Sequence, residues 1–288
     1  METLQQKWVM ACIDGSAMSD AVVDYAAWIA EKVQSPLELM HTIEHGMLLD
    51  NVNRSARHTP NMREAMMQDL SAQERAESKR LIAEGKQMLD AIVQRLEGRG
   101  IKEITARQRH GDLASALEGI EDEIRVLVIG LRGEDHTGEE KAVGAQLEET
   151  IRALHKPIFI ANGEFKIPKS LMLAYNDTEG ARKALQFVCK SPLYAEMEIH
   201  LVHVNDKEHI GRPILEAAEV SLIRSGRQYK TALLSGDAQT ALMTYQQTHD
   251  LDLTVMGAFK HGALHKLFFG SFTLKILMNS NKPVLLVR

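Results

Sequence analysis

The sequence predicts an α/β protein built as two tandem domains, each an open-twisted, parallel sheet of five strands with helices on both faces. Short apolar runs alternate with segments of helical periodicity, which is typical of a parallel sheet covered by helices. Landmarks of the first half recur in the second: Asp14 corresponds to Asn176 and His41 to His203, both at an offset of 162 (176 − 14 and 203 − 41). The 288 residues also suffice for two domains of ordinary size.

Three later landmarks recur at a shorter offset of about 126 (236 − 111 = 125, 257 − 130 = 127 and 283 − 157 = 126). The first is a glycine-aspartate turn, at His110–Asp112 and Ser235–Asp237. The second is a strand that ends in glycine, at Val128–Gly130 and Val255–Gly257. The third is a strand that starts with lysine and proline, at Lys156–Ile158 and Lys282–Val284. The drop from 162 to about 126 indicates an insertion of roughly 36 residues in the first copy, between its second and third strands. A repeat of this length indicates two homologous domains rather than a solenoid.

Each copy is expected to contain five strands, because five short apolar runs in it are bounded by turn residues. In the first copy these are Val9–Ile13, Leu37–Ile43, Ile104–Arg109, Val126–Leu131 and Pro157–Ala161. In the second copy they are Leu171–Tyr175, Met197–Val204, Tyr229–Leu234, Leu253–Gly257 and Val284–Val287. Amphipathic segments lie between them, with Val22, Tyr25, Ala26, Ile29 and Val33 on one helical face, and Leu81, Leu89, Ile92, Val93 and Leu96 on another. Right-handed crossovers are expected between the parallel strands.

The domain boundary is expected at Asn162–Lys169, where turn residues cluster between the two copies. The domains accordingly span residues 1–163 and 168–288. The connection is too short for a long flexible linker, so the two halves are expected to pack against each other.

The insertion, at about residues 45–80, is polar and rich in methionine, and Pro60 interrupts it. One interpretation is a loop followed by an N-terminal extension of the next helix. The other is a mobile lid or a surface that docks a partner protein, because methionine adapts to varied partners. Both remain open from the sequence.

Composition limits the function classes. The net charge is −5, with 34 basic and 39 acidic residues, which argues against nucleic-acid binding by bulk charge. Two cysteines, Cys12 and Cys189, make neither a disulfide framework nor a zinc site. The sequence shows no signal-peptide pattern and no apolar stretch near the ~20 residues that cross a bilayer, so a cytoplasmic protein without a membrane span is expected.

A ligand site is expected at the carboxyl ends of the strands, where the strand order reverses. Three segments of each copy converge there: the turn after the first strand, the end of the second strand, and the glycine-containing loop after the fourth strand. Glycines before a helix N-terminus offer free N–H groups and the positive end of the helix dipole, which suit phosphate.

These segments resemble the universal stress protein family. In the second copy, Gly257 to Gly262 and then Gly270-Ser271 are similar to the loop G-x-x-G-x9-G-[S/T] of the nucleotide-binding members. In the first copy, Gly130, Gly133 and Gly144 resemble the variant loop in the first half of tandem members. The resemblance covers essentially the whole chain and implies two Rossmann-like α/β/α sandwiches.

The resemblance also implies an adenine nucleotide, such as ATP, as the ligand. In the second copy, Gly257, Gly270 and Ser271 match the family pattern, while Lys260 stands at the second glycine (270 − 260 = 10) and Asn176 replaces the aspartate after the first strand. Val204, which ends the second strand, completes this set of expected nucleotide-binding residues. In the first copy the expected residues are Asp14, Gly130, Gly133 and Gly144; the last spacing is 11 (144 − 133), and Ala145 replaces the hydroxyl residue.

The charges of the two loops differ. Lys260 brings a Cβ atom that interferes with a close backbone approach, and also an ammonium group able to pair with phosphate. Acidic residues in the first copy's loop repel phosphate: Glu134, Asp135, Glu139 and Glu140. The second copy is therefore the better candidate for nucleotide.

Other catalytic or metal-binding patterns are not matched. The sequence has no P-loop and no nucleophile elbow. His261 and His265 have the spacing of two metal ligands on a helix, but no third ligand is evident nearby, so no metal site is expected. We expect His41 and His203, which end strands beside the predicted cleft, to be wall or core residues rather than catalysts, and we expect no catalytic residues.

The sequence thus favours a non-catalytic, cytoplasmic stress-response protein that binds ATP or a related adenine nucleotide and signals to an unknown protein partner. One alternative is a scaffold, or a binder of a small apolar ligand lined by Met40, Leu131 and Phe259, that does not depend on ATP. Another is a slow ATPase, for which no base that activates water is visible.

The resemblance further implies that the last strands of the two copies, Ile158–Ala161 and Val284–Val287, pair antiparallel. One chain then forms a pseudo-dimer, and this pairing protects an otherwise open edge. Whether two chains associate again into a homodimer is left open.

Overall fold

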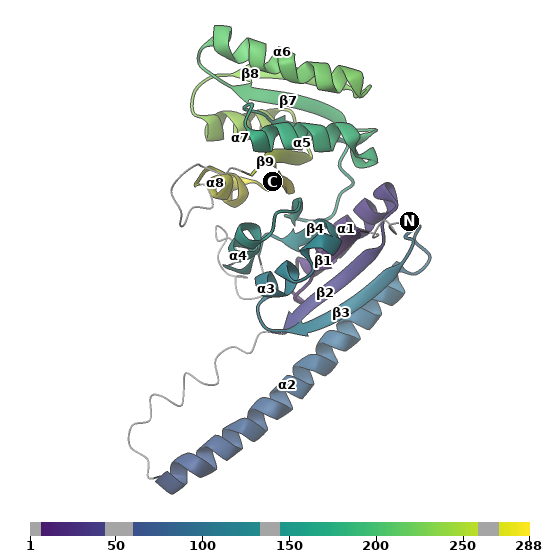
Figure 1. The fold of residues 1–288 in the computed structure, drawn as a ribbon, viewed down its shortest axis with the longest axis vertical. Helices are drawn as coiled ribbons and strands as arrows, with labels where there is room; N and C mark the ends of the chain where they lie inside the picture. The colour runs from purple at the N-terminus through teal and green to yellow at the C-terminus, as the bar shows by residue number, and fades with distance from the viewer. Residues whose placement is uncertain (1–6, 44–59, 133–144, 259–270) are drawn as a thin grey trace.

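The fold is one continuous, twisted sheet with helices on both faces (Figure 1). The computed structural model describes residues 7–43, 60–132, 145–258 and 271–288, with the backbone alone described at 60–75, 145 and 271. We call residues 7–162 half one and residues 163–288 half two. Half one contains β1 (Trp8–Cys12), α1 (Ser19–Val33), β2 (Leu37–Ile43), α2 (Pro60–Leu96), β3 (Ile104–His110), α3 (Leu113–Glu118), η1 (Glu121–Glu123), β4 (Ile124–Gly130), α4 (Ala145–Ala153) and β5 (Ile158–Ala161).

Half two repeats this order without the long second helix. It contains β6 (Ser170–Ala174), α5 (Glu179–Lys190), η3 (Pro192–Tyr194), β7 (Glu198–Val204), α6 (Glu208–Arg224), β8 (Tyr229–Leu234), α7 (Ala238–Thr248), β9 (Leu253–Gly257), α8 (Ser271–Asn279) and β10 (Val284–Val287). All ten strands predicted from the apolar runs are confirmed, with ends that shift by at most two residues.

The two halves join through their last strands. The strand order is β3-β2-β1-β4-β5-β10-β9-β6-β7-β8, and β5 pairs with β10 antiparallel, with Phe159 opposite Leu285. The other neighbouring strands are parallel. The expected antiparallel pairing of Ile158–Ala161 with Val284–Val287 is therefore confirmed.

Buried side chains fill both faces of the sheet and continue through the join. Helices α1, α2, α5 and α6 pack on one face, where Phe159 and Leu285 belong to the same apolar cluster. Helices α3, α4 and α8 pack on the other face, where Ile158 and Leu286 share a second cluster, and α7 completes that layer through Leu242. Each half thus buries apolar surface against the other, as expected from the short connection between them.

The repeated glycine-aspartate turns are helix caps. Gly111 and Gly236 have φ values of +100° and +89°, a conformation that glycine adopts without strain. The carboxylates of the following residues accept hydrogen bonds from the backbone: Asp112 from Ser115 N at 2.7 Å and Asp237 from Thr240 N at 3.0 Å. These N–H groups lower the pKa of both carboxyls. The landmark therefore recurs because each half starts a helix at this point.

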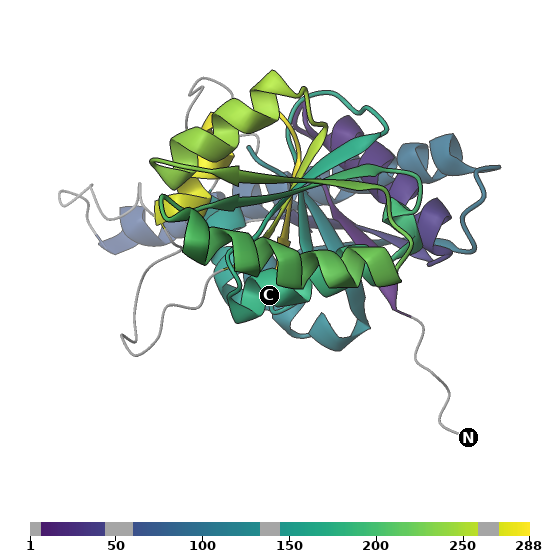
Figure 2. The ribbon, with the colours of Figure 1, turned by 90° about the horizontal axis from the view of Figure 1, so that it is seen from above.

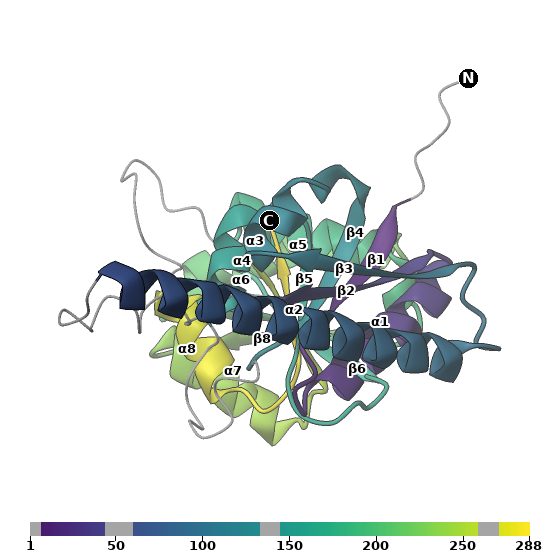
Figure 3. The ribbon, with the colours of Figure 1, turned by 90° about the horizontal axis from the view of Figure 1, so that it is seen from below.

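The insertion lengthens helix α2, which projects beyond the sheet (Figures 1 and 3). Pro60 begins this helix rather than interrupting it, at a position where the missing N–H is not needed. At ~1.5 Å per residue, its 37 residues span about 55 Å. The helical interpretation is thereby confirmed for residues 60–80, whereas residues 45–59 lie outside the described part of the chain. The lid or docking role remains a prediction.

The C-terminal part of α2 corresponds to α6 at the offset of 126. Gly85, Leu89 and Leu96 match Gly211, Leu215 and Leu222, and all six are buried. The first residue of α6 corresponds to Ile82 (208 − 126), so residues 60–81 of α2 have no counterpart in half two.

Candidate functional site

The predicted cleft segments meet at the point where the strand order reverses. In half one, β1 lies between β2 and β4, so the turn after β1 and the end of β4 adjoin at the carboxyl edge of the sheet. In half two, β6 lies between β7 and β9 in the same way. Five of the ten expected nucleotide-binding residues are described in full: Asp14, Gly130, Asn176, Val204 and Gly257.

The other five residues are placed only in part or not at all. Gly133, Gly144, Lys260 and Gly270 lie outside the described residues, as do Phe259 and the pair His261/His265. Ser271 is the first residue of α8, and only its backbone is described. The roles of these residues remain predictions.

In half one, Asp14 organises the turn between β1 and α1. Its Oδ1 atom accepts hydrogen bonds from Ser16 N at 3.0 Å and from the Ser19 hydroxyl at 3.2 Å. The Ser19 hydroxyl oxygen in turn accepts from Gly15 N at 3.0 Å, and Gly15 has a φ of +83°. The half-buried carboxylate is thus held at the carboxyl end of β1 by local bonds.

In half two, the amide of Asn176 accepts hydrogen bonds within the turn between β6 and α5, as the Asp14 carboxylate does in half one. Its Oδ1 atom accepts from Thr178 N at 3.4 Å and from the Thr178 hydroxyl at 2.8 Å. Thr178 itself caps α5 by accepting from Ala181 N at 3.3 Å. The replacement of aspartate by asparagine therefore preserves the turn and removes only the charge at this position.

A carboxylate missed in the sequence stands one residue later. Asp177 occupies the position of Gly15 (177 − 15 = 162) and keeps a positive φ of +56° without being glycine. Its side chain accepts a hydrogen bond from the Tyr175 hydroxyl and pairs with Arg182, both at 3.0 Å. These contacts, that with Arg182 above all, lower the pKa of Asp177. Burial, reinforced by Asp177, raises the pKa of Tyr175 to about 12.

Gly257 is explained by packing between a strand and a helix. A Cβ atom at Gly257 would overlap the backbone of Gly180 and Ala181 at the start of α5, and would lie 2.6 Å from the Gly180 carbonyl oxygen. A Cβ atom at Gly180 would in turn lie 2.9 Å from the Ala258 oxygen. The close approach of the two backbones therefore requires glycine at residue 257 whether or not a ligand binds.

Gly130, the counterpart of Gly257, is less constrained. A Cβ atom there would lie 3.2 Å from the Met18 Cβ and 3.3 Å from the Arg132 oxygen. Met18 occupies the position of Gly180 (180 − 18 = 162). At Gly130 the nearest atom is therefore a side-chain carbon, whereas at Gly257 the nearest atoms belong to a helix backbone.

The two strand-ending histidines have different surroundings. His203, beside the half-buried Val204, is 5% exposed and its Nδ1 donates to the Tyr175 carbonyl oxygen at 2.8 Å. Its Nε2 is buried and has no hydrogen-bond partner among the described residues. His41 is more exposed, and its Nδ1 lies 3.2 Å from Gln108 Nε2. His203 is thus a core residue, whereas His41 is partly exposed, and a place for either in the wall of a cleft stays a prediction.

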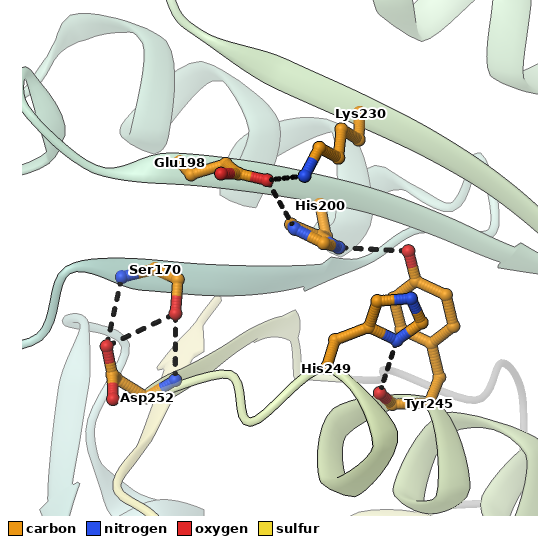
Figure 4. Close-up of polar contacts among 7 residues, drawn as sticks. All are labelled: Ser170, Glu198, His200, Lys230, Tyr245, His249 and Asp252. Atoms are coloured by element: carbon orange, nitrogen blue, oxygen red, sulfur yellow. Dashed lines mark hydrogen bonds and ion pairs between the residues drawn. The ribbon is translucent and has the colours of Figure 1, made fainter.

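A polar cluster lies at the opposite end of half two, near the starts of β6, β7 and β8 (Figure 4). His200, which is 3% exposed, contacts Glu198 through Nε2 and the Tyr245 hydroxyl through Nδ1, both at 2.9 Å. Lys230 also pairs with Glu198, and the ring of His249 stacks on that of Tyr245 with centroids 4.0 Å apart. Burial lowers the pKa of His200 despite Glu198. Because neighbouring side chains occupy both of its ring nitrogens, the cluster is structural.

The described ranges contain neither a metal-binding cluster nor a membrane-spanning helix. No group of three or more histidine, cysteine, aspartate or glutamate side chains there has the arrangement of a metal site. Of the helices described, none combines the length and the apolar character that a membrane span requires. Cys12 is buried, which raises its thiol pKa, and Cys189 is a second free cysteine.

Comparisons with known proteins agree with this architecture. A universal stress protein of Synechocystis sp. is 28% identical over 286 residues, which cover 98% of this chain and 100% of the relative. A universal stress protein of Thermus aquaticus is 28% identical over 136 residues, which cover 42% of this chain and 98% of that single-domain-sized relative.

Solved structures show the same fold. A universal stress protein of Archaeoglobus fulgidus superposes with a TM-score of 0.73 at 16% identity, covering 99% of both chains. A universal stress protein described as putative, from Pseudomonas aeruginosa, superposes with a TM-score of 0.65 at 14% identity and covers 98% of this chain and 93% of that one. The profile of the Universal stress protein family matches residues 7–162 and 211–288, which is more than half of the sequence. The chain therefore belongs to the universal stress protein family, as a tandem of two such domains.

Proposed function

We propose that the protein is a non-catalytic binder of an adenine nucleotide and that half two holds the ligand. The observation that carries this proposal is the charge of the connection from β9 to α8. It contains Lys260, His261, His265 and Lys266, and no acidic residue follows Asp252 in the sequence. A basic loop that enters a helix at a hydroxyl-bearing residue, Ser271, suits a phosphate group.

The described part of half two supports a nucleoside beside that loop. The turn of Asn176 and the end of β7 at Val204 lie on either side of the buried His203. The Asn176 side chain supplies an amide in place of a carboxylate. A neutral donor and acceptor of this kind match the edge of a purine. Half one is the weaker candidate because its loop carries four acidic residues.

The test is the nucleotide content of freshly purified protein, released by denaturation and identified by mass spectrometry. We expect ATP or ADP in wild type and a strong reduction in Lys260→Gly and Ser271→Ala, with Ala145→Ser in half one as the matched control that leaves the content unchanged. Equal nucleotide content in all three variants contradicts a site in half two. Release of phosphate from added ATP would contradict a non-catalytic binder and support the alternative of a slow ATPase.

A scaffold without nucleotide is the second candidate, and one observation favours it. Packing against α5 fully accounts for Gly257, so this glycine is required even without a ligand. The apolar-ligand version of this candidate loses two of its lining residues, because Met40 and Leu131 are buried in the sheet core at 0% and 1% exposure. Absence of nucleotide from purified protein, together with no ATP binding in solution, would select the scaffold.

A further inference from the structure

Helix α6 follows β7 directly and lies on the outer end of half two, against β7 and β8 (Figures 1 and 2). Its first turn, residues 208–212, therefore stands at the carboxyl edge of the sheet, where open α/β sheets bind their ligands. Within this turn Gly211 is buried and the other four residues are exposed. The next buried residue of α6 is Leu215. The turn thus buries no side chain, and a segment with few buried contacts opens easily.

The sequence of this turn also favours opening. Lys207, at the N-cap position, makes no side-chain hydrogen bond to the helix, whereas Thr178 and Asp237 cap α5 and α7 of the same half. Pro213 has no N–H group to donate to the His209 carbonyl oxygen. The turn therefore has one hydrogen bond fewer to the rest of the helix, and its free end has no cap.

The turn covers His203, the next-to-last residue of β7. A Cβ atom at Gly211 would lie 2.6 Å from Leu233 Cδ1, 3.0 Å from Asn205 Cβ and 3.3 Å from His203 Cδ2. Cδ2 is bonded to Nε2 in the imidazole ring. Glycine therefore lets the helix backbone close over the edge of the ring that carries Nε2, and with the turn in this place His203 is 5% exposed.

The closed position leaves one polar atom of His203 unpaired. Nδ1 donates to the Tyr175 carbonyl oxygen, so Nε2 carries the lone pair of the neutral ring. Nε2 is buried and has no hydrogen-bond partner among the described residues. A buried acceptor without a partner destabilises the state that buries it, and access to water removes this penalty. The ring beneath the turn thus favours opening as well.

Half one lacks this arrangement. Gly85 of α2 occupies the position of Gly211 (211 − 126 = 85), and 25 residues of the same helix precede it (85 − 60 = 25). His41 occupies the position of His203, and its Nδ1 has a polar neighbour, Gln108 Nε2, at 3.2 Å. A long continuous helix over a ring with a polar neighbour gives no reason for local opening at this point.

We propose that the first turn of α6 is a lid over His203, which opens while the sheet and the rest of α6 stay folded. In the closed position, Nε2 of His203 is out of reach of solutes. In the open position it is a neutral hydrogen-bond acceptor at the carboxyl edge of half two, for a ligand that carries an N–H or O–H donor. This device does not depend on which ligand half two binds.

Histidine modification by diethyl pyrocarbonate, located by peptide mass spectrometry, tests the lid in the ligand-free chain. The reagent acylates an imidazole nitrogen with a free lone pair, so Nε2 of His203 reacts when the lid opens. His200 is the internal control, because it is 3% exposed but both of its ring nitrogens have partners. We expect His203 to react about tenfold faster than His200, since only His203 lies under a turn that opens locally.

Two substitutions that strengthen the turn should slow this reaction. Lys207→Ser supplies an N-cap, and Pro213→Ala restores a donor for the His209 carbonyl oxygen. Each is expected to slow modification of His203 about fivefold and to leave His200 unchanged. Arg224→Ser, at the other end of α6, is the matched control and leaves both rates unchanged. Because the first two variants stabilise the helix, a failure to fold does not produce the expected result.

Low concentrations of urea separate a lid from wider unfolding. Opening of one turn exposes little surface, so the His203 rate should hardly change with urea, whereas hydrogen exchange of the β7 amides should accelerate. A His203 rate that rises as steeply as this exchange overturns the lid, because the ring is then reached only when the sheet unfolds. A His203 rate equal to that of His200, or one that Lys207→Ser leaves unaltered, also overturns it.

Discussion

Asn162 and Arg288 occupy the same position in the two halves (288 − 162 = 126), and each side chain caps the last helix of the other half. Asn162 Nδ2 donates to the Ser280 carbonyl oxygen, just after α8, at 2.5 Å. Arg288 Nη1 donates to the Leu154 carbonyl oxygen, just after α4, at 2.5 Å, and to that of Ile151 at 2.6 Å. Leu154 and Ser280 are themselves equivalent (280 − 154 = 126). The pseudo-twofold relation is thus built into side-chain contacts as well as strand pairing.

This exchange predicts an unequal loss of stability. Arg288→Ala removes a charged donor from carbonyl groups that have no helical partner, and we expect it to cost about 2 kcal/mol. Asn162→Ala removes one neutral donor and is expected to cost about 1 kcal/mol. Arg152→Ala, which breaks an exposed ion pair with Glu148, is the control and should change stability by less than about 0.5 kcal/mol. Urea denaturation measures all three, and equal effects would contradict the capping role.

Gly257→Ala tests whether packing or ligand explains the glycine at the end of β9. The added Cβ overlaps the backbone of α5, so we expect a loss of about 3 kcal/mol in the absence of any ligand. Gly130→Ala is the matched control in half one and should cost about 1 kcal/mol, because its nearest contact is 3.2 Å away. If Gly257→Ala leaves the ligand-free protein as stable as wild type, the glycine is there for a ligand instead.

At Asp177 we expect the positive φ to destabilise the fold and the side-chain hydrogen bonds to stabilise it. Asp177→Ala keeps the positive φ and loses the contacts with Tyr175 and Arg182, so a loss of about 2 kcal/mol is expected. Asp177→Gly loses the same contacts but relieves the strain, and it should recover about 1 kcal/mol of that loss. Thermal unfolding compares the two variants. Equal melting temperatures would show that the backbone at this residue is unstrained.

The lowered pKa of His200 leads us to expect a lower free energy of unfolding as the pH falls below 6.5. Burial lowers its pKa in the folded state below the ordinary value of 6.5, so the unfolded chain binds the proton first. The contribution of His200 is complete above pH 6.5 and is lost as pH falls toward the folded pKa. Unfolding free energies measured from pH 7 to 5 should fall more steeply for wild type than for His200→Gln. Parallel curves would show that His200 is not the group that titrates.

Features set by neighbouring residues in the sequence were predicted, and features set by contacts between distant residues were not. The strands followed from local apolar runs, and the repeat revealed the two glycine-aspartate turns, whereas the capping roles of Asp112 and Asp237 appear only in the structure. Asn162 and Arg288 were missed because their partners lie in the other half and appear only once β5 and β10 pair. Pro60 was read as an interruption although proline also begins helices.

The candidate site was harder to predict for a physical reason. A glycine pattern looks the same whether a ligand or a neighbouring helix excludes the Cβ atom, and for Gly257 the structure supplies the helix. The carboxylate sought at Asn176 is present one residue later, at Asp177, where the sequence motif did not place it. Reading Asn176-Asp177 as a pair would have revealed this shift.

The most direct test of the central claim is isothermal titration calorimetry of ATP into wild type, Ser271→Ala and Ala145→Ser. We expect one molecule of ATP bound per chain in wild type, a large loss of affinity in Ser271→Ala and no change in Ala145→Ser, because the proposed site is in half two. No heat of binding even at millimolar ATP, or binding that Ser271→Ala leaves intact, would contradict a nucleotide site at the start of α8.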